Sequence, residues 1–270
     1  MGASNPYFRT KLITSQTNNK MIPEFLNEFK TQLEKYKLET IKISATPLEN
    51  EESLQVFDNK FLGTPYLPKG MEYPKDKENK PMVLWAQINF ADVPVLDDYP
   101  NQGILQFFVS AEWFDMDDYK VVFHDTISEE FQTDFSFLTE EMYEESPIYR
   151  EHKLDFSKEI EYGSSEDFRF DMNFNNQDYW DFQETLTKDQ TEEIEKIIDG
   201  TGHKIGGYAY FTQADIRDYN KDLKQDVLLL QIDTDDEIMF GDSGVANFFI
   251  NPEDLKNKRF EKAWFNWDCC

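Results

Sequence analysis

Two stretches of the chain repeat one pattern of apolar and polar positions. The first is Met82–Trp113, which reads MVLWAQINFADVPVLDDYPNQGILQFFVSAEW, and the second is Asp226–Asp254, which reads DVLLLQIDTDDEIMFGDSGVANFFINPED. The block VLxxQI recurs at an offset of 144 residues, and the block GxxxFF recurs at an offset of 141. A connecting loop that differs in length by three residues explains the change in offset. The pattern therefore predicts an internal duplication.

The repeated blocks have the composition of β-strands. VLWAQI and VLLLQI are apolar runs of strand length, which indicates burial on both faces. ILQFFV and VANFFI are rich in β-branched and aromatic residues, and each follows a glycine. A third strand is expected after each pair, at Tyr119–Asp125 and, at an offset of 141, at Phe260–Asn266. Asn251 followed by Pro252 is typical of a helix start, so a one-turn helix is expected before the last strand.

One helix is expected ahead of each copy. Within Met21–Thr40 the apolar residues recur at steps of three and four, which predicts an amphipathic helix. In Thr187–Ile198, Thr187 can cap the helix, Gln190 stands where a capping box requires it, and Gly200 ends it. Since a helix precedes the strands in both copies, we expect the helix to belong to the repeat.

The remaining signals are weaker. Ile41–Pro47 is predicted as a short strand, Phe137–Glu145 as a helix, and Glu159–Phe174 alternates like an exposed strand. Together the elements predict the fold class α+β, with internally duplicated helix-plus-antiparallel-strand units packed as one body with pseudo-twofold symmetry. No linker rich in Gly, Ser or Pro separates the copies. We expect a single domain over 1–270, with repeat 1 at about 21–125, an insert at about 126–186 and repeat 2 at about 187–270.

The charge of the chain narrows the choice of partners. It contains 54 acidic residues against 27 basic ones, a formal net charge of −27. Such a field repels nucleic acid and anionic membranes, so neither is expected as a partner, and it attracts cations and basic proteins. A strongly negative surface also keeps a protein dispersed, which is the alternative explanation. The oligomeric state has no signal in the sequence.

The expected location is the cytoplasm. No apolar run approaches the roughly 18 residues of a membrane helix, and the first residues, MGASNPYFRT, do not resemble a signal peptide. The only cysteines, Cys269 and Cys270, are adjacent at the end of the chain. That is too few for a disulfide framework and badly placed for a metal site. The sequence assigns these two thiols no role.

The tetrapeptide Gly241–Gly244 reads GDSG, like the nucleophile loop of trypsin-like proteases. None of the three histidines, His124, His152 and His203, stands in the context of that family's general base. The first copy has PNQG at the matching place. We interpret GDSG as a tight turn before a strand, and we expect no catalytic residues from it.

The acidic run Asp233–Glu237 resembles the opening of a calcium loop. An EF-hand needs Gly at its sixth position and Glu at its twelfth, and here Ile238 and Gly244 stand there. A solvated hairpin is one interpretation, and a cation site of another kind, with Asp233, Asp235 and Asp242 as candidate metal ligands, is the other. No cofactor is expected.

Polar residues recur inside the apolar blocks, Gln87 with Gln231 and Asn89 with Asp233. An unpaired buried glutamine costs on the order of 1–3 kcal/mol, so these side chains are expected to have fixed partners. They either serve the core or line a shared groove near a pseudo-twofold axis. His203, in the glycine-rich turn GHKIGGY, is a further binding candidate that could face an anion, although the turn lacks the ending of a phosphate loop.

Several blocks resemble the YwqG-like bacterial family, whose function is unknown. They are FLGTPYLP from Phe61, AQINF from Ala86, GILQFF from Gly103, HKIGGY from His203, LQID from Leu230 and GDxGxxNFFI from Gly241. The resemblance runs from about Phe25 to the C-terminus. It implies an α+β fold with an internal repeat and a cytoplasmic protein, and it carries over no catalytic residues. Ala209 stands where family members commonly have proline.

Three functions compete. The leading hypothesis is a non-catalytic acidic module that binds a basic protein, for instance as an immunity-type neutraliser of a basic toxin. The alternative is an enzyme that binds a small molecule or a cation between the repeats, built from Gln87, Gln231, Asp233 and Asp242. The third is a structural adaptor with exposed aromatic residues. Its candidates are Trp113, Phe114, Tyr179 and Trp180.

Overall fold

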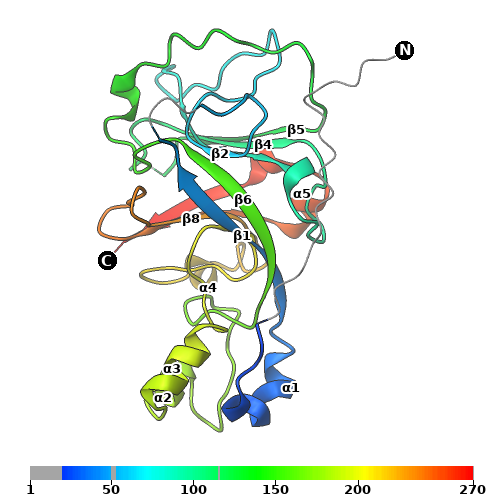
Figure 1. Ribbon diagram of the computed structural model, residues 1–270, viewed down its shortest axis with the longest axis vertical. Coiled ribbons are helices and arrows are strands. Elements are labelled where there is room, and N and C mark those ends of the chain that lie inside the picture. Colours follow the sequence, from blue (N-terminus) through cyan, green and yellow to red (C-terminus); the bar gives the residue numbers. More distant parts are fainter. Residues whose placement is uncertain (1–19, 50–52, 115, 270) are drawn as a thin grey trace. The chain divides into compact units, whose positions relative to one another are not determined.

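The computed structural model describes residues 20–49, 53–114 and 116–269 (Figure 1). Within them the chain forms two compact units. Unit 1 is built on Ser44–Phe156, and unit 2 on the residues up to Ile43 together with those from Ser157 onward. The strands β1 (Leu38–Pro47) and β6 (His152–Glu161) each supply residues to both units.

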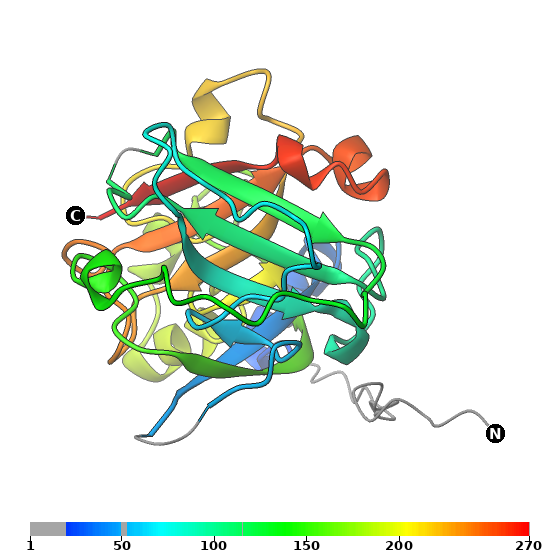
Figure 2. The ribbon, with the colours of Figure 1, turned by 90° about the horizontal axis from the view of Figure 1, so that it is seen from above.

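Unit 1 consists mainly of antiparallel strands in the order β6-β2-β3-β4-β5. Figure 2 shows β3, β4 and β5 side by side. The only helices among its described residues are the 3₁₀ turns η2 and η3. The bounds are β2 Lys60–Phe61, β3 Val83–Asn89, η2 Phe90–Asp92, β4 Ile104–Val109, β5 Tyr119–His124 and η3 Glu140–Tyr143.

Unit 2 has antiparallel strands in the order β10-β9-β8-β7-β1 and several short helices. The strands are β7 Lys204–Gly206, β8 Val227–Asp233, β9 Val245–Ile250 and β10 Trp264–Asp268. The helices are η1 Glu24–Phe29, α1 Lys30–Leu33, α2 Tyr179–Gln183, α3 Lys188–Glu195, α4 Ile216–Tyr219, α5 Pro252–Lys256 and η4 Phe260–Lys262. None of the helices in the described ranges is long and apolar enough to cross a membrane.

The predicted fold class is wrong. Antiparallel strands dominate the structure, and it is not a duplicated helix-plus-strand α+β body. The longest helix in the described part of the chain, α3, has only 8 residues. Both helical segments that were assigned to separate repeats lie in one core of unit 2, where Leu26, Phe29 and Leu33 join Ile194 and Ile198. The two predicted helices therefore both belong to unit 2, and unit 1 has no corresponding helix among its described residues.

The first predicted helix is also too long. It was expected over Met21–Thr40 but ends at Leu33, and strand β1 begins at Leu38. The physical reason is the segment LETIKIS, whose β-branched residues alternate with polar ones and pair with β7. Glu159–Phe174 does not form one exposed strand, since β6 ends at Glu161. The helix expected over Phe137–Glu145 is reduced to the 3₁₀ turn η3.

The four apolar strands are where the sequence predicts them. β3, β4 and β9 are buried along their whole length, and β8 is buried except for its first residue. The pairs β3–β4 and β8–β9 share one register, and each contains a bulge at the matching place, between Leu84 and Ala86 and between Leu228 and Leu230. The predicted caps are confirmed too: Thr187 and Gln190 form a capping box, and Asn251 caps α5 ahead of Pro252.

The third strand of each set matches at a different offset from the predicted one. In β4–β5, Ile104 pairs with His124, and in β9–β10, Val245 pairs with Asp268. His124 thus corresponds to Asp268 at an offset of 144 residues and not at the predicted 141. The reason is that Phe260–Lys262 forms η4, so strand β10 begins only at Trp264.

Unit 2 contains a buried network of charges around Arg217. Its guanidinium contacts the Asp215 carboxylate at 2.6 Å and the Asp167 carboxylate at 2.9 Å, and all three side chains are almost fully buried. The guanidinium also lies over the Phe249 ring, 4.5 Å from its centroid. Burial raises the pKa of Asp167, but the charges of Arg169 and Arg217 outweigh it and hold that pKa well below its usual range. The network joins the loop at Asp167 to α4 and the sheet.

We expect Arg217→Leu to lower the free energy of unfolding by about 3–5 kcal/mol, because it leaves buried carboxylates without their cation. The matched control is Arg259→Leu, which removes a partly exposed pair with Asp254 and should cost at most about 1 kcal/mol. Urea unfolding followed by tryptophan fluorescence measures both. Equal losses in the two variants would contradict a stabilising role for the buried network.

Candidate functional site

The Gln87 side chain uses its full hydrogen-bonding capacity inside unit 1. Its Oε1 accepts from the Tyr66 amide at 2.7 Å and from Gln106 Nε2 at 2.8 Å. Its Nε2 donates to the carbonyls of Val56 at 2.8 Å and Asp58 at 3.0 Å. An amide of this kind has two acceptor and two donor positions. Gln87 therefore fastens a loop and a turn to strand β3.

Gln231 makes the corresponding contacts inside unit 2. Its Oε1 accepts from the Tyr210 amide at 2.8 Å, and its Nε2 donates to the carbonyls of Gly200 at 2.7 Å and Gly202 at 2.8 Å. Each of these three partners lies 144 residues after a partner of Gln87. Both glutamines are fully buried. Within its own unit, each amide serves the core.

Asn89 and Asp233 bond the backbone where their strands end. Asn89 accepts from the Ala91 amide at 3.2 Å and so caps η2, and its Nδ2 donates to the Phe57 carbonyl. The Asp233 carboxylate accepts from the amides of Gly202 at 2.6 Å and Thr234 at 2.8 Å. These contacts hold turns in place.

His203 has both ring nitrogens engaged. Its Nδ1 accepts from the Asp233 amide at 2.9 Å, which assigns the proton of the neutral ring to Nε2. Nε2 then donates to the Asp235 carboxylate at 3.0 Å. The histidine is buried, and Asp235 is partly exposed. This arrangement orients the loop after β8, and both ring nitrogens contact groups of this chain: the anion that His203 faces is the Asp235 carboxylate.

Asp242 and Ser243 lie on an exposed turn before β9. Gly241 has a φ of 57° and Ser243 a φ of 69°, and the Gly244 amide donates to the Phe240 carbonyl at 2.7 Å. Nowhere in ranges 20–49, 53–114 and 116–269 do three or more His, Cys, Asp or Glu side chains gather as they would around a metal ion. The candidate ligands Asp233, Asp235 and Asp242 are thus not brought together as a cluster of that kind.

The predicted binding residues divide between the units. Gln87 and Asn89 belong to unit 1, whereas His203, Gln231, Asp233 and Asp242 belong to unit 2. Of the aromatic candidates, Trp113 and Tyr179 are buried, while Phe114 and Trp180 are exposed by 58% and 52%. Trp113 and Phe114 stack with their ring centroids 4.2 Å apart.

Sequence reasoning missed two buried lysines, Lys60 and Lys204, although the offset of 144 residues links them. Lys204 Nζ donates to the Glu161 carboxylate at 2.9 Å with both side chains fully buried, and burial lowers the pKa of Lys204 to about 8. Lys60 Nζ donates to the carbonyls of Gln55 and Thr64, and burial lowers its pKa also. An amine with a lowered pKa is a possible nucleophile. At an exposure of 1% or less, neither amine reaches solvent.

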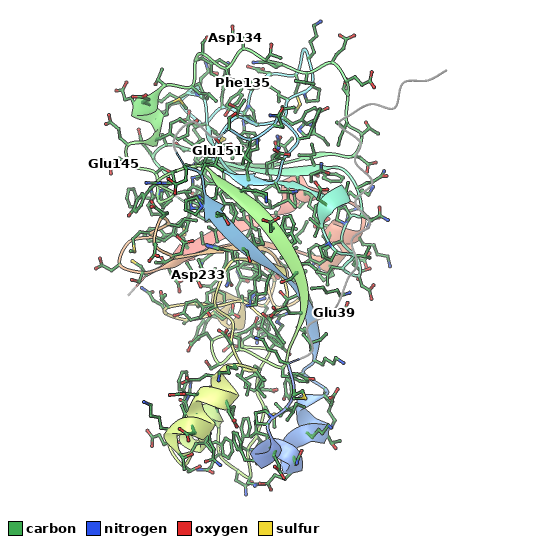
Figure 3. All side chains as sticks on the ribbon, viewed as in Figure 1. Glu39, Asp134, Phe135, Glu145, Glu151 and Asp233 are labelled. Atoms are coloured by element: carbon green, nitrogen blue, oxygen red, sulfur yellow. The ribbon has the colours of Figure 1, made fainter. Side chains whose placement is uncertain are left out.

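The acidic segment, which we define as Asp125–Tyr149, is a strongly negative surface of unit 1. It contains eight acidic residues and no lysine or arginine, and all eight are exposed. The eight are Asp125, Glu129, Glu130, Asp134, Glu140, Glu141, Glu144 and Glu145. Figure 3 labels Asp134 and Phe135 on its outer loop and Glu145 just after η3. Phe137 and Tyr149 are exposed within the segment, by 38% and 60%.

Several apolar residues of the acidic segment pack on the body of unit 1. Phe135 and Phe137 lie against Tyr73, with ring centroids 6.2 Å and 5.0 Å away. Phe135 and Leu138 join the small core formed by Leu67, Tyr73, Met82, Leu84 and Phe108. The segment is thus held by its aromatic side and presents its carboxylates outward.

We expect Gln87→Met to lower the free energy of unfolding by about 2–4 kcal/mol. The substitution leaves the buried Tyr66 amide and the carbonyls of Val56 and Asp58 without their hydrogen-bond partner. The control Gln102→Met changes an exposed residue of the same unit and should alter stability by no more than about 0.5 kcal/mol. Chemical denaturation measures the difference. A Gln87→Met variant as stable as the control would instead indicate an amide kept for a ligand.

The pKa of Lys204 predicts a pH dependence. The folded value of about 8 lies below the ordinary 10.5, so the unfolded chain binds more protons between these pH values. Stability from this site therefore rises with pH across that window. We expect the stability difference between wild type and Lys204→Met to grow by about 1–3 kcal/mol from pH 8 to 10. The exposed control Lys188→Met should show no such growth in denaturation measurements.

Comparison with known proteins identifies a family but assigns it no activity. No curated protein matches the chain. One family model, described as a domain of unknown function (DUF1963), matches residues 59–269, which is most of the 270 residues and includes strands of both units. The chain therefore belongs to the DUF1963 family of proteins of unknown function.

Proposed function

We propose that the protein is a non-catalytic module that binds a basic protein partner through the acidic segment of unit 1. The observation that carries the proposal is the exposure of all eight carboxylates over 25 residues that contain no lysine or arginine. Complementary charge speeds the encounter of two proteins and selects between partners. The net charge of −27 also attracts a basic protein over longer distances.

The acidic segment also offers apolar anchors. Protein interfaces commonly combine buried aromatic side chains with a polar rim. Phe137 and Tyr149 are exposed among the carboxylates, and Phe137 is held by Tyr73. Glu140, Glu141, Glu144 and Glu145 make no ion pair among the described residues. Their charges are available to a partner.

The proposal extends to the finer hypotheses drawn from sequence. The partner would be met in the cytoplasm, the chain would be of the YwqG-like kind within its family, and neutralisation of a basic toxin is one form that the binding would take. The rival, an enzyme built on Gln87 and Gln231, has less support. The side-chain amides of Gln87 and Gln231 donate their hydrogen bonds to backbone carbonyls of their own units.

We expect the variant Glu140→Gln, Glu141→Gln, Glu144→Gln, Glu145→Gln to lose affinity for a basic partner by about 10- to 100-fold at low salt, since each charge contributes a fraction of a kcal/mol. The matched control carries Glu184→Gln, Glu193→Gln, Asp222→Asn and Glu261→Gln. It removes the same charge from exposed positions of unit 2. Affinity capture from the native cells, followed by titration of the purified partner, measures both.

The control variant should retain the partner, and moderate salt should weaken binding of the wild type. Equal loss in both variants would point to net charge alone. Binding that is indifferent to salt and to the four glutamates would contradict the proposal.

A further inference from the structure

The connection between β4 and β5 presents an aromatic side chain to solvent. Phe114 is exposed by 58%, although it is a large apolar residue. The connection leaves the sheet and returns to it at one place, because the Ser110 amide donates to the Asp118 carbonyl at 2.9 Å. The Ser110 hydroxyl also accepts from the Glu112 amide at 3.2 Å. These bonds fix the backbone on which Phe114 stands.

The Phe114 ring is held by a second aromatic residue. It stacks on Trp113, with the ring centroids 4.2 Å apart and the planes 26° apart. Trp113 is buried, and its ring meets the buried Trp85 edge to face at 5.8 Å. A side chain that is fixed before binding loses little conformational entropy when a partner arrives. Phe114 is therefore a preformed aromatic platform.

Trp113 also joins this platform to the acidic segment. Its Nε1 donates to the Glu145 carbonyl at 2.7 Å. The side chains of Glu144 and Glu145 are exposed at this end of the segment, and Figure 3 labels Glu145. Asp117, three residues after Phe114, is exposed as well. An exposed ring and exposed carboxylates thus stand on two segments that are bonded to each other.

The corresponding connection of unit 2 lacks such a platform. It follows β9, whose register against β8 matches that of β4 against β3. The residues Asn251–Ala263 contain a single aromatic residue, Phe260, which is buried, and Leu255 of α5 is buried too. The strand pairs shared by the two units therefore do not require an exposed aromatic residue here. Phe114 is particular to unit 1, the unit with the acidic segment.

A ring beside carboxylates distinguishes the two common basic side chains. The guanidinium of arginine is planar and weakly hydrated, so it can stack on an aromatic ring while its N–H groups donate to a carboxylate. The ammonium of lysine is compact and strongly hydrated, and it gains less from the ring. The carboxylates alone attract both. The platform at Phe114 therefore favours arginine.

We propose that Phe114, together with the Glu144–Glu145 end of the acidic segment, forms a subsite for an arginine side chain of the basic partner. The subsite rests on the function proposed for unit 1 and adds the side-chain chemistry that the partner must present. The glutamates supply attraction to any basic segment, and Phe114 supplies the preference for arginine over lysine.

Two synthetic peptides of equal length and charge test the subsite. Every basic residue is arginine in one peptide and lysine in the other, and each is titrated calorimetrically into the full chain at low salt. We expect the wild type to bind the arginine peptide about three- to tenfold more tightly. Phe114→Leu should remove this preference and leave the affinity for the lysine peptide within about twofold, which also shows that the variant is folded. Phe114→Tyr keeps the ring and should keep the preference.

The matched control is Trp180→Leu, which removes an aromatic residue of similar exposure from unit 2 and should keep the preference for arginine. The variant with Glu140, Glu141, Glu144 and Glu145 changed to glutamine should weaken the binding of both peptides.

The outcomes separate this subsite from the function on which it rests. Equal affinity of the wild type for the two peptides, with both lost in the four-glutamine variant, would leave the binding function standing and overturn the arginine subsite. A preference that persists in Phe114→Leu, or that disappears in Trp180→Leu, would overturn it too. Failure of the wild type to bind either peptide would overturn both proposals.

Discussion

The structure depends on buried amides that tie irregular backbone to strands. Gln87 and Gln231 each stand in the middle of an apolar strand and bond the carbonyls and amides of loops that have no ladder of their own. A loop buried beside a sheet carries polar groups that must be satisfied. Each glutamine satisfies three such groups at a single point. The loops can therefore pass close to the core without regular structure.

The buried basic side chains also have fixed partners inside the units. The fully buried cations among the described residues, Lys60, Lys204 and Arg217, bond backbone carbonyls or buried carboxylates inside the units. Each basic side chain that is used in this way is withdrawn from the surface. Five carboxylates of the described residues are buried as well, so burial leaves the excess of acidic over basic side chains on the exterior close to that of the composition of 54 acidic and 27 basic residues. The acidic segment of unit 1 is the clearest expression of that imbalance.

Sequence reasoning recovered the parts of the fold that local patterns determine. The strands around Gln87 and Gln231, the cap at Thr187 and the helix start at Asn251 follow from short-range chemistry, and all are present. The fold class failed because one helix was assigned to each repeat, whereas LETIKIS, at the end of the first predicted helix, joined a sheet partner far along the chain. The third strand was misaligned because a 3₁₀ turn takes up residues that an ungapped comparison assigns to the strand.

The candidate sites show the same division. Repetition in the sequence singled out Gln87, Asn89, Gln231 and Asp233, but their backbone partners lie in loops that no pattern specifies. His203 was named for its glycine-rich turn, and its real neighbours, the Asp233 amide and Asp235, are brought to it by the pairing of β7 with β8. Lys60 and Lys204 carried the same offset as a signal. They were overlooked because a lysine is rarely expected in a core.

The bulges at Trp85 and Leu229 also decide which side chains of β3 and β8 share a face. Leu84 faces Phe108 and Gln87 faces Gln106, so the extra residue places Leu84 and Gln87 on one side of the sheet, which plain alternation would forbid. Without that one residue, Leu84, Ala86 and Gln87 would face Phe108, Phe107 and Gln106 in an unbroken ladder, and the glutamine would keep its side of the sheet. The bulge instead gives the strand one residue that has no opposite partner, at the same place in β3 and in β8. The loops that follow β3 and β8 differ in length by three residues, whereas the two bulged ladders are equally long.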